Sequence, residues 1–344
     1  MTTRTPPFLP DGSPFRVAAV LFDFDGTLTH PGDLDFATIR SSVGCPPGMG
    51  LIEYLEGVTD PEERRRKAAV LEEAESAAAA NGRVNAGAPE LVALLRGRGI
   101  PMAVITRNRR GPVEVALDCL PGIGPDDFAL IVTRDLALDP KPQPDGVLYV
   151  LSELRLDPRD VLLIGDHSFD IEAGRAAGTM TMFLQNDVRE ADPVPPADFT
   201  VSDLHQAARI IRYGLPLPAG KLPADLLEES LGGIVTDDPS VLVSARLGED
   251  AAAVDVSEED VLVLASDPIT LASDAAARYA VLVNANDVAT SGALPRWLLT
   301  TLLFPVGSTP SQVAAMVRDL HDACHPWGIS LCGGHTEVTD AVTR

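Results

Sequence analysis

The chain has 344 residues, 45% of them hydrophobic, and a formal net charge of −23 at pH 7. This length suffices for two domains of ordinary size, and the apolar content suffices for a buried core. The negative charge argues against nucleic acid and anionic membranes as partners because both are themselves negative, but a metal ion and a few cations could still hold a small phosphorylated substrate.

The N-terminal residues 1–7 lack the apolar core of a signal peptide, and no apolar run approaches the length of a membrane span. The four cysteines, Cys45, Cys119, Cys324 and Cys332, include no CxxC pair. So few cysteines in a chain of this length predict no disulfide framework and fit a reducing compartment. We therefore expect a cytoplasmic protein.

Apolar runs alternate with helical patterns over residues 17–183, which predicts an α/β fold with a mostly parallel sheet covered on both faces. The predicted strands are Val17–Phe22, Pro101–Thr106, Phe128–Val132, Val161–Gly165 and Thr179–Phe183. The predicted helices between them are Pro89–Arg98, Pro112–Cys119, Pro144–Leu154 and Phe169–Ala177.

Residues 30–88 interrupt this alternation because they contain no clear strand pattern. Their charged, Ala-rich segment Pro61–Ala80 predicts a helix, and we interpret the insertion as a small helical cap. A short strand at Asp198–Val201 and a helix at Ser202–Arg212 close the predicted first domain, residues 1–213.

The Pro- and Gly-rich segment 214–220 predicts an interdomain linker. A second pattern of strands and helices follows it. We expect residues 221–344 to form a second α/β domain.

Two aspartates, Asp23 and Asp25, directly follow the first predicted strand, and Gly26 ends that strand. Open α/β sheets bind their ligands at the carboxyl ends of their strands. One carboxylate there can attack a phosphorus atom while the other transfers a proton. Because two carboxylates this close repel each other, the pair indicates a metal ion nearby.

Further chemical groups follow the later strands in order. Thr106 ends the second strand, where its hydroxyl and the following backbone N–H groups can hold a phosphoryl oxygen. Lys141 precedes a predicted helix, and its ammonium can neutralise the phosphoryl group and the attacking carboxylate. Asp166 is placed to bind Mg²⁺, and Asp170, one helical turn on, can brace Lys141 or a metal-bound water.

These signals, in this order, resemble the motifs of the haloacid dehalogenase (HAD) superfamily, and the helical cap resembles that of its phosphoglycolate-phosphatase-like branch. The resemblance covers residues 17 to about 212 and implies a Rossmann-like core. It implies Asp23 as the nucleophile that becomes an aspartyl-phosphate and Asp25 as general acid and then base.

The same resemblance implies Thr106 and Lys141 as phosphate-binding residues and Mg²⁺ as the cofactor. The expected metal-binding set is Asp23, Asp25, Asp166 and Asp170.

Substrate choice is expected to come from the cap. Three arginines, Arg107, Arg109 and Arg110, follow Thr106 and could contact a second anionic group of the substrate. We expect at least two of them to be exposed loop arginines. The motifs also admit an isomerase similar to β-phosphoglucomutase as an alternative to hydrolysis.

A second set of polar groups lies in residues 219–344. Its carboxylate and amide oxygens suit Mg²⁺, and a Gly-Gly backbone suits close approach of phosphate. In order these residues resemble the N-terminal half of the aminoimidazole ribonucleotide synthase superfamily, and especially the carbamoyl dehydratase of hydrogenase maturation and its relatives.

That resemblance implies ATP at the second domain. Asp250, Asp267 and Asp287 would bind the Mg²⁺ of ATP, with Asn286 assisting. The family pairs such domains through their sheets, which implies a homodimer. The residues implied near the nucleotide phosphates are Lys221, Gly333, Gly334 and Thr336.

The chain departs from this second family near Arg344, where neither the family's C-terminal α/β domain nor the cysteine tail of the hydrogenase-maturation enzyme follows. We expect either a fragment of a longer protein or a half-domain that serves dimerisation. Histidines and cysteines within fifteen positions also suggest zinc, but their spacing fits no standard finger. They are His321, Cys324, His325, Cys332 and His335.

The sequence thus predicts a Mg²⁺-dependent phosphatase of a small phosphorylated metabolite, fused to an ATP-binding-type half-domain. Two other functions stay open. One is an ATP-dependent synthase, kinase or dehydratase with an accessory HAD domain, and the other is a non-catalytic dimerising scaffold.

Overall fold

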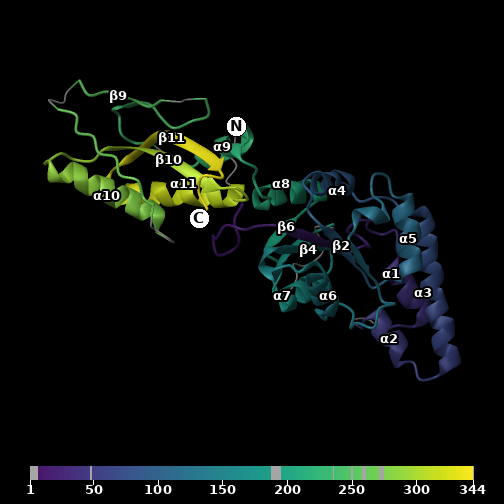
Figure 1. Cartoon of the computed structure of the whole chain (residues 1–344). Helices are drawn as coiled ribbons and strands as arrows, with labels where there is room; N and C mark the ends of the chain where they lie inside the picture. The colour runs from purple at the N-terminus through teal and green to yellow at the C-terminus, as the bar shows by residue number, and fades with distance from the viewer. Residues whose placement is uncertain are drawn as a thin grey trace. The chain divides into compact units, whose positions relative to one another are not determined.

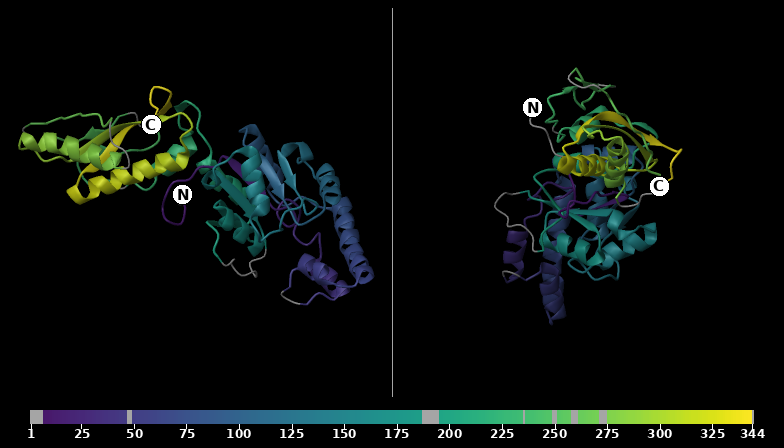
Figure 2. Two further views of the ribbon diagram at one scale, coloured as in Figure 1. Left: turned by 60° about the horizontal axis from the view of Figure 1, so that its bottom comes forward. Right: turned by 90° about the vertical axis from the view of Figure 1, so that its left-hand side faces the viewer.

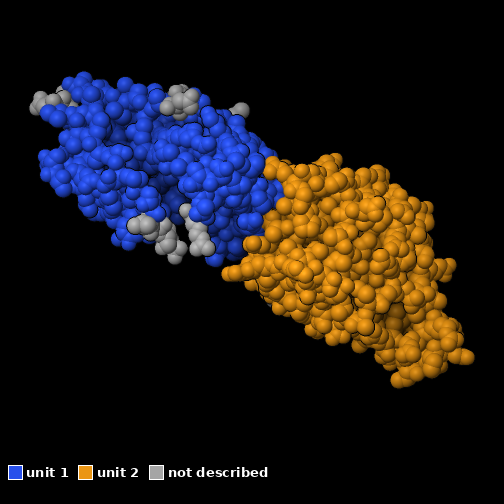
Figure 3. Space-filling view, in the orientation of Figure 1, with its two compact units in different colours: residues 1–16, 212–344 blue, residues 17–211 orange. Residues whose placement is uncertain are grey.

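The computed structural model describes residues 7–46, 49–186, 195–234, 236–248, 251–257, 261–270 and 275–343. The chain divides into two compact units (Figure 3). We call Val17–Ile211 the central unit, and Met1–Arg16 together with Arg212–Arg344 the split unit.

The central unit is built on a six-stranded parallel sheet with the strand order β3-β2-β1-β4-β5-β6 (Figure 1). β1 lies near the middle, between β2 and β4. The strands are β1 Ala19–Phe22, β2 Met102–Ile105, β3 Leu130–Val132, β4 Val161–Gly165, β5 Met180–Leu184 and β6 Phe199–Val201.

Helices cover this sheet, and every side chain of β1 is buried. The helices α6 and α7 cover one face, where Val147 and Val150 pack with Leu21. Val20 and Phe22, which point to the opposite face, are also fully buried. The helices of the core are α4 Ala88–Gly97, α5 Arg110–Cys119, α6 Asp145–Leu154, α7 Ser168–Ala177 and α8 Leu204–Gly214. Continuous apolar strands buried on both faces confirm the predicted α/β fold.

The helical cap follows β1 and contains α1 Phe36–Val43, α2 Leu51–Gly57 and α3 Pro61–Asn81 (Figure 1). The helix predicted at Pro61–Ala80 is α3. It begins where the Asp60 side chain accepts a hydrogen bond from the backbone N–H of Glu62. The cap has its own apolar cluster, whose buried members are Leu34, Ile39, Val43, Leu51, Leu55 and Leu71.

The segments that enter and leave the cap pair with each other. The N–H of His30 donates to the carbonyl oxygen of Arg83 at 2.7 Å, and the N–H of Asn85 donates to that of Leu28 at 2.9 Å. The cap is therefore joined to the core directly beside the carboxyl end of β1.

The split unit contains a three-stranded sheet in the order β10-β11-β7. β10 Trp297–Pro305 and β11 Ser330–Thr339 are parallel, and β7 Gly220–Lys221 joins β11 antiparallel. Helices α10 Ala276–Thr290 and α11 Pro310–Cys324 pack on this sheet through an apolar cluster (Figure 2). The other elements are α9 Ala224–Leu231, β8 Val241–Val243 and β9 Ala253–Val254.

The N-terminal segment belongs to the split unit, although we expected residues 1–213 to form the first domain. The carbonyl oxygen of Phe15 accepts hydrogen bonds from the hydroxyls of Ser311, at 2.7 Å, and Thr309, at 3.0 Å. The N–H of Phe15 donates to Ser311 Oγ at 3.1 Å. Local sequence patterns cannot predict polar contacts between residues almost three hundred positions apart.

The segment expected to be a linker, residues 214–220, is also part of the split unit. Leu217 is 4% exposed and packs with Leu222, Val313 and Val338. Its N–H donates to the carbonyl oxygen of Ser308 at 2.9 Å. The alternating leucines of this segment therefore bury side chains despite its Pro- and Gly-rich composition. Across the described residues, no helix has the length and apolar character needed to span a bilayer.

Candidate active site

The loop after β1 brings Asp23 against the loop after β4. The backbone N–H of Asp23 donates to the carbonyl oxygen of Ile164 at 2.9 Å. The chain then turns at Gly26 with φ of +74°, and a methyl group on Gly26 would overlap the carboxylate of Asp166. Glycine thus allows the close approach that sets Asp23 and Asp166 at one edge of the sheet.

Lys141 joins two buried carboxylates. Its side chain is 4% exposed, and Nζ lies 2.5 Å from Asp23 Oδ1 and 2.5 Å from Asp170 Oδ1. Asp170 lies in the first turn of α7 and also accepts a hydrogen bond from the N–H of His167 at 3.1 Å. The lysine expected to neutralise the attacking carboxylate therefore lies directly against it.

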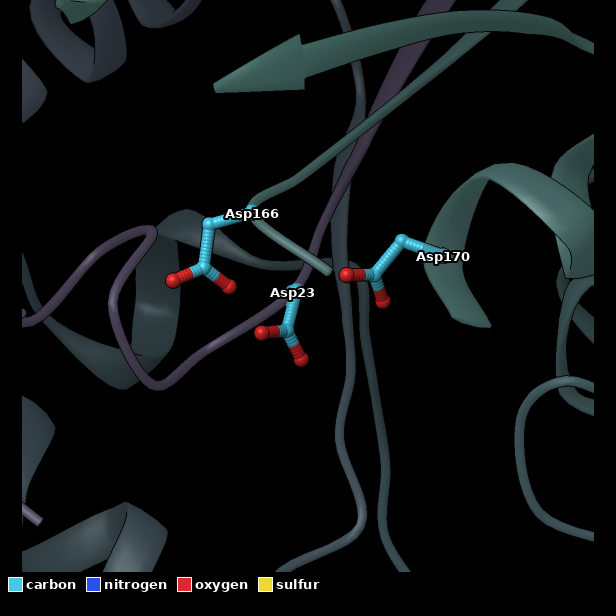
Figure 4. A group of neighbouring side chains, drawn as sticks. All are labelled: Asp23, Asp166 and Asp170. Atoms are coloured by element: carbon cyan, nitrogen blue, oxygen red, sulfur yellow. The ribbon is translucent and has the colours of Figure 1, made fainter. Parts of the chain in front are cut away.

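Three of the four aspartates expected to bind a metal ion converge. Asp23, Asp166 and Asp170 each offer a carboxylate oxygen, and these oxygens lie within 4.8 Å of one another (Figure 4). The side chain of Asp25 is not part of this group. Carboxylate oxygens are the hard ligands that Mg²⁺ prefers, and this group holds three carboxylates against one lysine ammonium. The group therefore fits Mg²⁺.

Burial and mutual repulsion raise the pKa values of Asp23, Asp25 and Asp166. Burial raises the pKa of Asp23 to about 6, although the Lys141 ammonium works against this rise. Burial, followed by the negative charge of Asp23, raises the pKa of Asp25 to about 7 and that of Asp166 to about 8. Burial works to lower the pKa of Lys141, but the charges of Asp170 and Asp23 raise it above its ordinary value. Ionisation of Asp23, Asp25 and Asp166 is thus less favourable than in water, and a further cation at the site would favour it.

Asp25 is held by a residue that our sequence analysis missed. Asn108 Nδ2 donates to Asp25 Oδ2 at 2.6 Å, and the Asn108 N–H donates to Thr106 Oγ1 at 3.1 Å. Thr106 is 6% exposed at the end of β2. Asp25 and Asn108 line a small pocket with Glu75 and Ala79 of α3. The general acid proposed from the sequence therefore lies between core and cap.

Two further asparagines support the loop after β1. Asn85 and Asn186 each donate a side-chain hydrogen bond to the carbonyl oxygen of Gly26, at 2.8 Å and 2.7 Å. Asn186 Nδ2 also donates to Asp166 Oδ2 at 3.0 Å. Neither residue stands in a recognisable motif, so only the fold reveals this role.

Charged residues join the cap to the core near the site. Arg134 donates to Glu75 of α3 through two hydrogen bonds of 2.7 Å and 3.0 Å, and Glu75 is buried. Arg107 donates to Glu53 of α2 at 2.5 Å. The side chains of Arg109 and Arg110 are 51% and 60% exposed. Two of the three loop arginines are thus exposed, as expected, while Arg107 is 19% exposed.

The residues predicted for the second site are placed in two groups. Asp267 and Asp287 are exposed and share a hydrogen bond, which raises the pKa of Asp287, while the N–H of Asp267 donates to Asn284 Oδ1 at 2.7 Å. Asn286 is exposed on α10, and Asp250 lies outside the described residues.

The other group lies along β11 and β7. Lys221 lies opposite Glu337 in the antiparallel pair of β7 and β11. On the other side of β11, its residues Gly333, Gly334 and Thr336 pair with residues of β10. A methyl group on Gly334, whose φ is +151°, would overlap the Thr300 carbonyl oxygen, so close strand pairing already requires this glycine. Within the described residues, no hydrogen bond or ion pair links this group to Asp267 or Asp287.

The histidines and cysteines near the end of the chain have structural surroundings. Cys324 and Cys332 are buried, and all four cysteines are free. Burial raises the pKa of the Cys324 thiol to about 11. His335 is half exposed and lies 3.5 Å from Glu337. Among the described residues, Asp23, Asp166 and Asp170 form the one group of at least three such side chains close enough to share a metal ion, and none of these histidines and cysteines belongs to it.

Comparison with known proteins gives two family matches. Residues 17–178 match the family described as haloacid dehalogenase-like hydrolase. Residues 248–343 match the family described as AIR synthase related protein, N-terminal domain.

Several known proteins are similar to part of this chain. N-acetylmuramic acid 6-phosphate phosphatase of Pseudomonas aeruginosa is 32% identical over 186 residues, which cover 48% of this chain and 80% of that protein. Phosphoglycolate phosphatase of Nitrosospira multiformis is 28% identical over 232 residues, covering 58% of this chain and 97% of that protein. The solved structure of CbbY from Rhodobacter sphaeroides in complex with phosphate is 22% identical, with a TM-score of 0.43, covering 55% of this chain and 95% of that chain.

Proposed function

The chain belongs to the haloacid dehalogenase-like hydrolases through residues 17–178, and from this premise we propose that it is a Mg²⁺-dependent phosphatase acting through an aspartyl-phosphate on Asp23. The family match and the relatives named as phosphatases make it a phosphoric monoester hydrolase. The observation that carries the proposed mechanism is the contact of buried Asp23 with Lys141, at the edge where Asp166 and Asp170 converge.

In the first step, a carboxylate oxygen of Asp23 attacks the phosphorus atom in line with the ester oxygen. The P–O bond to the substrate breaks, and Asp25 donates its proton to the departing oxygen. A pKa of about 7 keeps part of the Asp25 population protonated at neutral pH, as a general acid requires. Asn108 orients the carboxyl group through its 2.6 Å hydrogen bond.

In the second step, Asp25 accepts a proton from water, and the water oxygen attacks the phosphorus atom of the aspartyl-phosphate. The bond between phosphorus and Asp23 breaks, which releases inorganic phosphate and restores the carboxylate. Lys141 neutralises negative charge on the phosphoryl oxygens, with the Thr106 hydroxyl at the neighbouring strand end. Asp23, Asp166 and Asp170 would hold Mg²⁺, which supplies further neutralisation of the phosphoryl charge.

Turnover of p-nitrophenyl phosphate tests this proposal. We expect Mg²⁺-dependent hydrolysis that stops with EDTA and falls at least about a thousandfold in Asp23→Asn. Asp118→Asn, which changes an exposed carboxylate on α5, is the matched control and should retain wild-type turnover. Equal rates in wild type and Asp23→Asn would contradict the proposal.

For the split unit, we propose binding of the Mg²⁺ complex of ATP. The match to an AIR synthase-related domain and the contact between Asp267 and Asp287 support this function. Two neighbouring carboxylates can bind a cation once their shared proton leaves, so MgATP should raise the unfolding temperature more than Mg²⁺ alone. Absence of any added shift over a concentration series would count against the ATP site and against the ATP-dependent alternatives.

We also propose that the split unit pairs with a second copy of this chain. Leu299 and Leu303 of β10 are 57% and 48% exposed, and Val261 and Leu264 are 76% and 82% exposed. Light scattering after gel filtration should show a dimer that Leu299→Lys with Leu303→Lys converts to a monomer. A monomeric wild type at high concentration would contradict this pairing.

A further inference from the structure

Arg107 lies between two residues of the phosphoryl site. It follows Thr106, the expected phosphate ligand, and precedes Asn108, which donates to Asp25. Consecutive Cα atoms lie about 3.8 Å apart. The backbone of Arg107 therefore adjoins the place where the phosphoryl group and the leaving oxygen bind.

The Arg107 side chain contacts a residue from the far side of the central strand. Arg107 follows β2, whereas Phe169 lies in α7 after β4, and these two strands flank β1 on opposite sides. The Arg107 guanidinium carbon lies 5.2 Å from the centre of the Phe169 ring. Since β2 and β4 are about 10 Å apart, the contact between these two side chains bridges the strand between them, β1, whose carboxyl end leads to Asp23.

A carboxylate of the cap forms an ion pair with this guanidinium. Arg107 Nη2 donates to Glu53 Oε1 at 2.5 Å, and within the described residues Glu53 is the one carboxylate in ion-pair contact with Arg107. The Glu53 side chain is 43% exposed, whereas that of Arg107 is 19% exposed. Such partly exposed ion pairs add little stability, so a ligand anion can replace Glu53 without a large penalty.

The neighbouring arginines are placed differently. Arg109 pairs with Glu72 of α3 at 2.8 Å, and Arg110 pairs with Glu114 in its own helix at 2.7 Å. The side chains of both arginines are at least half exposed. Of the three arginines, Arg107 has the least exposed side chain, and it alone contacts Phe169 of α7.

We propose that Arg107 is a specificity residue that binds a second anionic group of the substrate, and that Glu53 holds this position when substrate is absent. The inference rests on the proposed phosphatase function and narrows its substrate class. The substrate is a small phosphomonoester that carries a carboxylate or a second phosphate a few bonds from the reacting phosphorus. A planar guanidinium binds both kinds of anion through paired N–H donors.

Matched substrate pairs test this assignment in the full chain. The first pair is 2-phosphoglycolate and 2-hydroxyethyl phosphate, which differ in one carboxylate. The second is propane-1,3-diol bisphosphate and 3-hydroxypropyl phosphate, which differ in one phosphate. Wild type should prefer the charged member of at least one pair, and that pair identifies the anion as carboxylate or phosphate.

In Arg107→Met, this preference in kcat/KM should fall about tenfold to a hundredfold, mainly through a higher KM for the charged substrate. Arg107→Lys should restore part of it, because it keeps the charge without the planar pair of donors. Glu53→Gln should lower KM for the charged substrate, because it removes the competing anion. Arg109→Met, the matched control, should keep the wild-type preference.

The outcomes separate this inference from the function on which it rests. If wild type hydrolyses p-nitrophenyl phosphate but Arg107→Met keeps the wild-type preference, the assignment of Arg107 is wrong while the phosphatase stands. If Arg107→Met lowers the rates for both members of a pair equally, Arg107 acts on the transferred phosphoryl group instead. If wild type hydrolyses no phosphoester, both proposals fail.

Discussion

The aspartates singled out in the central unit and those in the split unit differ in their surroundings. Asp23 and Asp170 contact a lysine that is itself buried, and a third carboxylate converges on them. Asp267 and Asp287 contact each other in solvent. A site whose charges are buried and braced is organised before the ligand arrives, whereas an exposed pair of carboxylates still has to be ordered by what it binds.

The largest effect expected from this difference concerns catalysis in the central unit. Asp25→Asn removes the transferable proton but keeps the shape and the neighbouring Asn108. We expect kcat to fall about a hundredfold to ten-thousandfold. Stopped assays with p-nitrophenyl phosphate and a phosphoenzyme trap measure it, and a variant with near-normal kcat would show that burial here does not mark a catalytic acid.

Substitution of one lysine in each unit compares how much the two sites contribute to the free energy of unfolding. Lys141→Met leaves Asp23 and Asp170 buried without their ammonium partner, which should lower the free energy of unfolding by about 3–5 kcal/mol. Lys221→Met changes an exposed residue of β7, and we expect almost no effect. Urea titrations of both variants measure the difference, and equal losses would remove the distinction between the two sites.

The raised pKa values in the central site predict how stabilisation of the chain by Mg²⁺ depends on pH. The pKa values of Asp23, Asp25 and Asp166 lie above their ordinary value of 3.8, so the folded chain disfavours the ionised forms. Without metal, stability therefore falls as pH rises from about 4 to about 8. A bound cation offsets this loss, so Mg²⁺ should stabilise the chain more at pH 8 than at pH 5, by about 2 kcal/mol.

Thermal unfolding with and without Mg²⁺ at the two pH values checks this expectation. Asp166→Asn is the informative control, because it should reduce the dependence on pH. Equal stabilisation at both pH values would mean that Mg²⁺ binds elsewhere.

The smallest effect is expected in the split unit. Asp287 is exposed, and the hydrogen bond and negative charge of Asp267 raise its pKa. Asp287→Asn removes the repulsion, so it should slightly raise the unfolding temperature at pH 7, and this rise should become smaller as the pH falls and Asp287 becomes protonated. Asp340→Asn, an exposed control, should cause no such rise. A fall at pH 7 would indicate that the pair already holds a cation.

The strands and much of the central site could be predicted because their signals are local. An apolar run such as Val161–Ile164 predicts a buried strand, and the polar residue that follows must lie at the strand's carboxyl end. Asp23, Thr106 and Asp166 could be found in this way. Asn108 has the same kind of signal, since it follows β2 closely, but an amide three residues beyond a strand has no distinctive pattern.

Other contacts depend on distant segments and could not be predicted locally. The charged face of α3 indicates solvent, yet Glu75 is buried against Arg134 from the core. Asn186 contacts Asp166 because β5 lies beside β4, which becomes known only once the strand order is known. Leu217 is buried for the same reason, since its partners include Val313, nearly a hundred residues later.

The hydrogen bonds of Phe15 with Ser311 have a consequence for synthesis on the ribosome. The two residues are 296 positions apart, and the whole central unit is translated between them. At typical elongation rates, about 15–60 s pass between the synthesis of Phe15 and that of Ser311. The central unit can fold during this interval, whereas the split unit completes its structure only after the nascent chain has passed α11.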